Sequence, residues 1–507
     1  MGGFTRASQR IAAVDLPIGQ RQWNWLSACL QRNQQTEIGR RYDFASIDSP
    51  DTYRDVLPIV DYEQFAGDIE RIAAGDTEVL FAGGAVAFER TGGSSDGSKL
   101  IPYSAASLSD FRGAITPWLR RLIAGHHLQG SAYWAISPAM RQPEVTPGGI
   151  AIGIDDSDYV AKELASAMLA ASAMPDWVGR LYRAQDWKLA TAYWLLRRRD
   201  LSLISVWSPT FMLGLLDAIV SLAEQLATLL TAGGTIAGHA APADANALGR
   251  LQAYLQHQDT QLLWPDLRLV SCWADAASRP YYEQLVSRIT HSQFEPKGLI
   301  STESVVSVPN GQGQLLLTAD HGFFEFLCDG QSLLANALSE GSEYEVIVTT
   351  AGGLYRYRTG DLVRCDGYNN DVPSLSFIGR DNLTSDLVGE KLTESFVVQC
   401  LYDIQGFRML VPERHPQPHY VLVTEHVSEM NSVALADKIE EQLRANPQYA
   451  YARDIGQLGK LLVRRADSPL ASYMDRASLT QARLGTVKVP ALRSEPDWLQ
   501  TFTLLQR

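Results

Sequence analysis

The spacing of apolar residues changes along the chain, and each change marks a different kind of predicted secondary structure. Through residues 17–80 the spacing is helical, most clearly in Gln22–Gln31 and Tyr62–Ala74. Two short β-prone segments follow, Val86–Arg90 and Leu100–Tyr103. Pro102 disfavours a helix directly after the small-residue loop between them. The pattern therefore predicts an N-terminal helical region followed by a pair of extended segments.

Helical patterns dominate again between residues 105 and 260, and strand character rises between 268 and 380. The helical region is broken by strand-like segments at Ala132–Ile136 and Leu203–Val206. The strands predicted further on are Leu267–Cys272, Leu315–Leu317, Phe323–Leu327, Tyr344–Thr349, Asp361–Cys365 and Leu375–Ile378. This alternation of helices and strands predicts a mixed α/β fold.

The C-terminal part of the chain has a separate alternation of its own. Its predicted elements are two strands and a helix, near Tyr420–Thr424, Lys460–Arg465 and Ser432–Ala445. We place a domain boundary near residues 381–390, where the glycine-containing Val388-Gly389-Glu390 follows Arg380-Asp381-Asn382. We therefore expect a large N-terminal domain of β-sheets and packed helices, residues 1–384, and a small, mobile α+β C-terminal domain, residues 385–507.

Composition and charge exclude several classes of partner. The chain has 507 residues, 46% of them hydrophobic, which is enough for more than one domain. Its formal net charge of −13 is not offset by a basic stripe, so neither a nucleic acid nor an anionic membrane is an expected partner. Residues Leu201–Leu230 are apolar but interrupted by Pro209 and Asp217, which favours a buried strand and helix over a membrane span.

Cysteine usage and the N-terminus predict a cytoplasmic protein. The five cysteines are scattered and lack CxxC spacing, which fits a reducing compartment better than a disulfide framework. Met1–Leu16 contains no apolar core of the kind that a secretory signal needs. The histidines form no zinc-binding spacing, and no GxSxG nucleophile motif is present.

A small-residue loop, Thr91-Gly92-Gly93-Ser94-Ser95-Asp96-Gly97-Ser98-Lys99, is the first candidate site. Successive small residues let backbone N–H groups converge on an anion, and the hydroxyls add donors to phosphate oxygens. The loop is not a Walker A motif, because Gly97 is followed by Ser98, Lys99 and Leu100 rather than by Lys and Ser/Thr. A flexible hairpin turn is the alternative interpretation.

The second candidate is Gly353-Leu354-Tyr355-Arg356-Tyr357-Arg358-Thr359-Gly360-Asp361. On a strand, the two tyrosines would face one side and the two arginines the other. Gly360 allows a bend that presents the Asp361 carboxylate, and a carboxylate can accept hydrogen bonds from both hydroxyls of a ribose. The alternative is a strand with a cross-strand ion pair and an aspartate in a turn.

The third candidate is Ser301-Thr302-Glu303, which follows an apolar segment. A glutamate there could hold Mg²⁺ that bridges phosphates, because hard cations take oxygen ligands and keep substrate phosphate in their shell. The alternative is an exposed glutamate at the end of a strand.

The order of these motifs is more informative than any one of them. A Ser/Gly loop, a Thr-Glu, a Tyr-Arg-Thr-Gly-Asp and a Gly-Arg-Asp follow one another, and in this the chain resembles the acyl-adenylate-forming enzymes. Within them it is most similar to the Gretchen Hagen acyl acid–amido synthetase family. The resemblance extends from about Thr36 to Pro490 and is most specific at Tyr355–Asp361. Further motifs that carry it are Ile38-Gly39-Arg40, Leu57–Glu63, Phe323–Phe326 and Asn446–Tyr449 followed by Arg453.

The resemblance implies an ATP site and a catalytic pair. The implied nucleotide-binding residues are Gly92, Gly93, Ser94, Ser95, Gly97, Thr302, Phe323, Phe324, Tyr357, Asp361 and Arg380. It implies Lys488 and Glu303 as catalytic residues, with Glu303 also a ligand of Mg²⁺. The chain departs from the family pattern at Asp96, where a threonine is frequent nearby, and at Phe323 and Phe324, where a tyrosine is frequent.

The implied activity is an ATP-dependent ligase that adenylates a carboxylic acid and transfers the acyl group to an amine, with an amino acid as the family-like acceptor. Mg²⁺ and the lysine would stabilise the charge that grows on phosphate oxygens. The C-terminal domain would rotate between the two half-reactions about a hinge at residues 381–389. The expected partners are small molecules, and the sequence does not define an oligomeric state.

Two other functions are compatible with the same motifs. An acyl-CoA ligase or aryl-acid-activating enzyme shares the first half-reaction, and a non-catalytic nucleotide-binding protein could keep the scaffold. Glu303, Asp361 and Lys488 together argue against the second of these. The acyl acid itself cannot be read from the sequence; candidate pocket residues in the helical region are Arg112, Tyr133, Trp134 and Trp207.

Overall fold

The structure is a computed structural model of the full chain, and it describes residues 16–91, 99–134, 144–154, 156–181, 183–380, 383–426, 429–478 and 487–505. The chain folds into two compact units, each assembled from separate segments. The first unit comprises Met1–Gly125, Pro143–Ala167 and Gly298–Phe377, and the second comprises His126–Gln142, Met168–Lys297 and Ile378–Arg507.

The first unit is built on a seven-stranded sheet. Its strands, in spatial order, are β11 (Ser307–Pro309), β12 (Leu315–Leu317), β17 (Val372–Arg380), β16 (Tyr357–Asn369), β15 (Glu343–Thr349), β13 (Phe323–Cys328) and β14 (Gln331–Leu334). Every pairing for which a register is defined in this sheet is antiparallel. Short turns therefore suffice to connect most of these strands.

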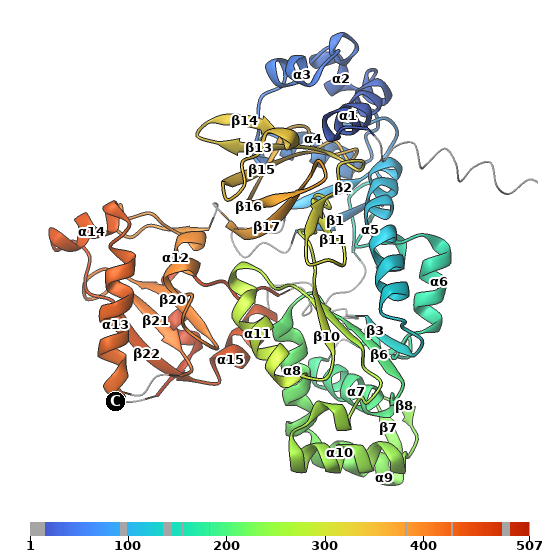
Figure 1. Ribbon diagram of the computed structural model, residues 1–507, viewed down its shortest axis with the longest axis vertical. Helices are drawn as coiled ribbons and strands as arrows, with labels where there is room; N and C mark the ends of the chain where they lie inside the picture. The colour runs from blue at the N-terminus through green and yellow to red at the C-terminus, as the bar shows by residue number, and fades with distance from the viewer. Residues whose placement is uncertain are drawn as a thin grey trace, which may run out of the picture. The chain divides into compact units, whose positions relative to one another are not determined.

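The N-terminal helices cover this sheet and bury their apolar sides against it (Figure 1). They are α1 (Ile18–Asn33), α2 (Glu37–Arg41), α3 (Pro50–Val56) and α4 (Tyr62–Ala74). Polar caps fix their starts: the Thr36 and Ser49 hydroxyls accept from backbone N–H groups of α2 and α3. A capping box starts α4, and Gly75 ends it in a left-handed conformation.

A second, four-stranded sheet completes the first unit. Its order is β2 (Leu100–Tyr103), β1 (Ala87–Arg90), β5 (Ala151–Ile152) and β4 (Glu144–Val145). The long helix α5 (Ala105–Gly125) follows β2 directly. The helix α6 (Lys162–Ala170) follows later in the chain.

The second unit contains a parallel four-stranded sheet. Its order is β10 (Gln293–Pro296), β9 (Leu269–Cys272), β6 (Leu201–Ser205) and β3 (Ser131–Trp134). Helices of this segment of the chain pack with it in one apolar core: α7 (Ala184–Arg197), α8 (Pro209–Ser221), α9 (Ala223–Ala232), α10 (Ala245–His257) and α11 (Arg279–Arg288). A small hairpin, β7 (Gly234–Ile236) and β8 (His239–Ala241), connects α9 to α10.

The C-terminal part of the second unit has its own sheet. Its order is β20 (Arg408–Glu413), β21 (His419–Thr424), β22 (Leu462–Asp467) and β23 (Thr503–Leu504). Both faces are buried: Leu410 and Leu422 contribute to one apolar cluster, and Met409 and Val421 to another. The remaining elements are β18 (Thr384–Ser385), β19 (Leu392–Thr393), α12 (Glu394–Cys400), α13 (Glu429–Leu443), α14 (Pro447–Asp454) and α15 (Pro469–Ser478).

Most predicted elements are confirmed. The helix Tyr62–Ala74 and the strands Leu100–Tyr103 and Leu315–Leu317 have the predicted bounds. The apolar segment from Leu201 forms the expected strand, which is followed by two helices rather than the one predicted. Within the described residues, no single helix is long and apolar enough to cross a membrane, although α8 and α9, bent by 68°, pass that test as a pair.

A buried ion pair fixes the start of β16 in the first unit. The Arg356 guanidinium donates to both oxygens of Glu325 on β13, at 3.0 and 2.9 Å, and the two side chains are 6% and 0% exposed. The same guanidinium donates to the carbonyl oxygens of Arg54 and Leu57, at 2.6 and 2.5 Å. One arginine therefore joins the sheet to the end of α3.

We predict that Glu325→Gln destabilises the protein strongly. The variant leaves the Arg356 charge buried without its counter-charge, which costs about 3–5 kcal/mol. Urea denaturation followed by circular dichroism measures the change. The matched control is Glu283→Gln, which breaks the exposed pair with Arg279 at 3.2 Å and should cost about 0–1 kcal/mol. Equal effects in the two variants would contradict the assigned importance of the buried pair.

Candidate functional site

The Ser/Gly loop lies between two paired strands. Arg90 of β1 pairs with Leu100 of β2, so the segments on both sides of the loop are extended and antiparallel. This confirms the predicted extended flanks, and no helix starts at Lys99 or Leu100. The predicted phosphate-binding residues Gly92, Gly93, Ser94, Ser95 and Gly97 lie outside the described residues.

The last loop residue, Lys99, is held by aromatic rings. Its ammonium lies 5.2 Å from the ring centroid of Tyr62 and 6.0 Å from that of Tyr357, one of the predicted nucleotide-binding residues. The backbone N–H of Lys99 also donates to the Thr91 hydroxyl across the base of the loop. A positive charge is thereby fixed at the foot of the loop, a contribution that the sequence reasoning did not assign.

Glu303 lines a small pocket of the first unit, and Thr302 precedes it in the chain. The Tyr103 hydroxyl, at the end of β2, donates to the Thr302 carbonyl oxygen at 2.6 Å. Glu303 is half-buried. The pocket is lined by Tyr103, Ser107, Asp110, Phe111, Ala114, Glu303, Ser304, Val305, His321, Thr350 and Ala351. Among the described residues, no group of three His, Cys, Asp or Glu side chains could hold a metal.

Asp110 gives this pocket a second carboxyl group, on α5. Burial raises its pKa from 3.8 to about 6, and a hydrogen bond from Trp25 and the charge of Arg32 oppose that rise. The pocket is therefore lined by two acidic side chains, Asp110 and Glu303. Asp110 has no motif around it, so only the fold could bring it to Glu303.

The Tyr-Arg-Tyr-Arg segment does not alternate as a strand throughout. Arg356 has a positive φ of 50°, and β16 starts one residue later. Arg356 pairs with Glu325, and Arg358 pairs with Glu345 on β15 at 2.7 Å. Both arginines thus form ion pairs with glutamates of neighbouring strands, and the pair of Arg358 is the cross-strand pair of the alternative interpretation.

Asp361 lies in a bulge of β16. Arg358 faces Ile347 and Leu362 faces Glu345, so the segment between them on β16 contains two more residues than the segment on β15. Gly360 has a φ of 73°, a conformation that favours glycine, and the Thr359 hydroxyl donates to the Val346 carbonyl oxygen. The expected bend at Gly360 is present, and it leaves the Asp361 side chain almost completely buried.

The predicted aromatic residues belong to the core of the first unit. Phe323, Phe324 and Tyr357 are each 1% exposed or less. Phe323 packs edge-on against Tyr53, with ring centroids 5.7 Å apart, and Tyr357 packs against Phe65 at 6.4 Å. Their burial explains the aromatic pattern as core packing, and a direct contact with a nucleotide stays a prediction.

Arg380 and Lys488, both in the second unit, lie around one acidic side chain. Burial raises the pKa of Glu394, while a hydrogen bond from the Ala491 N–H and the charges of Lys488 and Arg380 oppose the rise. Lys488 is exposed, whereas Val487 and Val489 on either side are buried. The predicted orientation of this lysine, away from its two apolar neighbours, is confirmed.

The C-terminal half of the predicted hinge is connected to β21 by hydrogen bonds. The Glu390 carboxylate accepts from the backbone N–H groups of Leu387 and Val388, at 2.7 and 2.8 Å. It also accepts from the hydroxyl of Tyr420, which lies 2.9 Å from the Ser385 hydroxyl. Asp381 and Asn382 lie outside the described residues.

The candidate acyl-pocket residues have different environments. Tyr133 is fully buried in the core of the second unit, and Arg112 donates to the Asp158 carbonyl oxygen. Trp134 and Trp207 are half-buried in the second unit. The sequence reasoning missed Lys297, whose ammonium lies 5.1 Å from the Trp207 ring centroid. A single lysine after a strand carries no motif that could have identified it.

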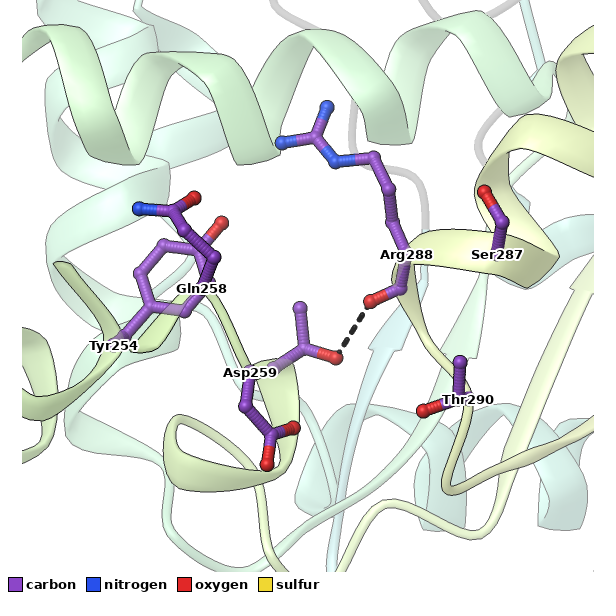
Figure 2. Close-up of a pocket in the computed structure, with 7 residues that line it drawn as sticks. Tyr254, Gln258, Asp259, Ser287, Arg288 and Thr290 are labelled. Carbon is purple, nitrogen blue, oxygen red and sulfur yellow. Dashed lines mark hydrogen bonds between the residues drawn. The ribbon is translucent and has the colours of Figure 1, made fainter. Parts of the chain in front are cut away.

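A pocket in the second unit contains none of the predicted site residues (Figure 2). Its lining residues are Tyr254, Gln258, Asp259, Thr260, Ser287, Arg288 and Thr290. The Thr260 hydroxyl donates to the Arg288 carbonyl oxygen at 2.9 Å, the dashed line in Figure 2. The Arg288 guanidinium is paired with Asp217 at 2.6 Å, so its charge is already used within the chain.

Comparison with solved structures identifies the class of fold. The chain superposes on a structure described as "AtGH3.15 acyl acid amido synthetase in complex with 2,4-DB" with a TM-score of 0.83 and 18% sequence identity, covering 98% of this chain and 96% of that one. A second structure, "GH3.15 acyl acid amido synthetase", gives a TM-score of 0.81 at 18% identity, covering 96% and 94%. The mixed α/β fold is therefore that of an acyl acid amido synthetase.

Family models cover most of the chain. The GH3 family N-terminal domain matches residues 8–294, the central domain residues 315–380 and the C-terminal domain residues 391–497. The chain belongs to the GH3 family, as its motifs indicated.

Curated relatives are distant in sequence but similar in extent. Indole-3-acetic acid-amido synthetase GH3.2 of Arabidopsis thaliana is 23% identical over 505 residues, covering 86% of this chain and 91% of the relative. Jasmonoyl--L-amino acid synthetase JAR6 of Nicotiana attenuata is 22% identical over 504 residues, covering 88% and 86%.

We predict that Asp110→Asn stabilises the protein at neutral pH. The folded carboxyl, with a pKa of about 6, binds its proton more tightly than the unfolded one at 3.8, so wild-type stability falls as the pH rises from about 4 to 6. The variant avoids this loss and should gain up to about 3 kcal/mol at pH 7.5. Urea denaturation at several pH values measures the gain. A difference from wild type that is the same at pH 4 and pH 7.5 would contradict the prediction.

Proposed function

We propose that this protein is an ATP-dependent ligase that adenylates a carboxylic acid and transfers the acyl group to an amine, with an amino acid as the acceptor. The observation that carries the proposal is membership of the GH3 family along nearly the whole chain. The names of relatives support the acceptor class, since they include an indole-3-acetic acid-amido synthetase and a jasmonoyl–L-amino acid synthetase.

The nucleotide site is assigned to the first unit. In the proposal, Gly92, Gly93, Ser94, Ser95 and Gly97 hold the phosphates and Asp361 accepts from the ribose hydroxyls. Thr302, Phe323, Phe324 and Tyr357 shape the rest of that site, and Arg380 leads to the small domain. The fixed ammonium of Lys99 at the foot of the loop supports a role for the loop in anion binding.

The donor set around Glu303 fits Mg²⁺. A half-buried carboxylate beside the hydroxyl groups of Ser107 and Ser304 offers the hard oxygen ligands that this ion prefers. With no group of three ligating side chains among the described residues, substrate phosphate and water would complete the shell. When bound, Mg²⁺ would neutralise charge on the phosphate oxygens.

The proposed reaction has two half-reactions. In the first, a carboxylate oxygen attacks the α-phosphorus of ATP, and pyrophosphate leaves. In the second, the amine nitrogen attacks the acyl carbonyl carbon, the bond to the AMP oxygen breaks, and the amine loses a proton. Lys488 acts in the first step by placing its ammonium between the carboxylate and the α-phosphate.

The small domain would move between the two steps. We keep the division into residues 1–384 and 385–507 and the pivot at the predicted hinge. The hydrogen bonds of Glu390 restrict which residues can act as the pivot, because the carboxylate connects Leu387 and Val388 to Tyr420 of β21. Residues 385–390 would therefore move with the small domain, which leaves the pivot N-terminal to them.

Pyrophosphate release that depends on an added carboxylic acid is the test of the proposed function. A screen of carboxylic acids by ATP–pyrophosphate exchange defines the acid, and the mass of the product formed with an amino acid or with CoA defines the acceptor. Binding of ATP without exchange for any acid would indicate a non-catalytic nucleotide-binding protein. A CoA thioester as the sole product would indicate an acyl-CoA ligase.

We predict that Asp361→Asn weakens ATP binding and adenylation while the protein stays folded. Two charge-assisted hydrogen bonds to the ribose would be lost, which amounts to about 2–4 kcal/mol. Calorimetric titration with ATP measures the change. The matched control is Asp366→Asn on the same strand, where an exposed carboxylate pairs with Arg364 at 2.9 Å. Unchanged ATP affinity in a folded Asp361 variant would rule out the ribose role.

We predict that Lys488→Ala slows adenylation at least about a hundredfold. Amide formation from a supplied acyl-adenylate should be much less affected, because the lysine acts on the α-phosphate step. The two half-reactions are assayed separately on one preparation. Lys460→Ala, which removes an exposed lysine of the small domain, is the control. Equal loss in both half-reactions, or loss in neither, would show that Lys488 does not have this role.

A further inference from the structure

A row of polar side chains crosses the parallel sheet of the second unit near its carboxyl edge. Trp134 of β3 pairs in register with Ser205 of β6, which pairs with Ser271 of β9, which in turn pairs with Glu295 of β10. In-register neighbours on parallel strands point to the same face, so these four side chains share one face. Parallel sheets are normally covered by apolar residues on both faces, which makes this polar row unusual.

Two donors of this row have no acceptor among the described residues. The Ser271 hydroxyl belongs to a side chain that is 0% exposed, and the indole nitrogen of Trp134 is buried as well. An indole nitrogen can only donate, and leaving a buried donor unpaired costs free energy. Both donors could therefore form a hydrogen bond with an acceptor that is not part of the described chain.

The next row on the same face adds a positive charge. Two positions further on, just past the C-terminal ends of these strands, lie Trp207, Trp273 and Lys297. The Lys297 ammonium donates to the Ser205 hydroxyl at 2.9 Å and lies 5.1 Å from the Trp207 ring centroid, and the residue is 6% exposed. The two indole rings have centroids 5.8 Å apart and are tilted by 41°.

The proposed catalytic lysine, Lys488, lies next to these residues. The Lys488 ammonium lies 4.8 Å from the Trp273 ring centroid. Trp207 and Trp273 are only half-buried, so their edges reach the solvent. Ligands of open parallel sheets bind outside the carboxyl ends of the strands, which is where these rings lie.

The donors of Lys297, Ser271 and Trp134 would suit a planar anion. One charged N–H and two neutral donors suit a carboxylate, whose two oxygens accept several hydrogen bonds at once. Glu295, the in-register neighbour of Ser271, would repel an anion, and it lies 3.9 Å from the Nε2 atom of His126. A carboxylate bound to Ser271 would therefore lie on the side of Ser205, away from Glu295.

We propose that Lys297, Ser271 and Trp134 form a subsite that binds a carboxylate group of a substrate. The proposal rests on the proposed ligase function, in which both the acid and an amino-acid acceptor carry this group. Trp207 and Trp273 form the apolar wall of the subsite, and Ser205 holds the ammonium of Lys297 in place. The two possible sources of the carboxylate are separated by the experiment.

The experiment compares three variants of the full-length enzyme. Ser271→Ala removes an unpaired donor, so its melting temperature should equal or exceed that of wild type, while the KM for one carboxylate substrate rises about tenfold. Lys297→Met should raise the same KM by tenfold or more and leave the KM for ATP unchanged. Ser202→Ala is the control: its hydroxyl already donates to the Ser131 carbonyl oxygen, so stability falls and no KM changes.

The half-reactions identify which carboxylate is bound. A raised KM for the acid in ATP–pyrophosphate exchange assigns the subsite to the acid. A raised KM for an amino-acid acceptor, with none for the corresponding carboxamide, assigns it to the acceptor. Unchanged KM values for both substrates, or a loss of stability in Ser271→Ala, would overturn the proposal. Absence of acid-dependent exchange in the wild-type enzyme would instead refute the proposed function.

Discussion

The buried pair between Arg356 and Glu325 is the constraint on which the first unit depends. A guanidinium in the interior requires a counter-charge and acceptors for its N–H groups, and Glu325 with two carbonyl oxygens supplies them. Meeting that requirement places Arg356 at a positive φ and joins β13 to the end of α3. Tyr355 and Tyr357 on either side then enter the core, and β16 starts in a fixed register.

The bulge at Gly360 follows from that fixed start. Arg358 is held to Glu345, and Leu362 faces the same glutamate across the sheet, so the surplus residues between them must leave the regular ladder. Glycine accepts the positive φ of the bulge, and Asp361 follows it. A carboxylate positioned by ion pairs on the strand keeps its orientation better than one on a loop. The most specific motif of the chain is thus held by two ion pairs.

The sequence predicted elements and motifs well where the signal is local. Tyr62–Ala74 has a complete amphipathic period and a capping box, and its bounds are confirmed. The strand β20 went unpredicted, because Arg408 and Pro412 interrupt its apolar pattern and only pairing with β21 defines it. The environments of Asp110 and Lys297 also depend on contacts between distant segments. The folding of each unit from separated segments is likewise set by tertiary contacts that no local pattern encodes.

If the proposed subsite binds a carboxylate, stability and ligand binding make opposite demands on the parallel sheet of the second unit. An apolar residue at Ser271 would remove a buried unpaired donor, and the row from Trp134 to Glu295 would then resemble other parallel sheets. The chain instead keeps polar groups there and adds a buried lysine beside them. Buried charges and unpaired donors are tolerated where a ligand or a reaction needs them. The Lys488 ammonium lies 4.8 Å from the Trp273 ring centroid, which places a second positive charge beside the same group of residues.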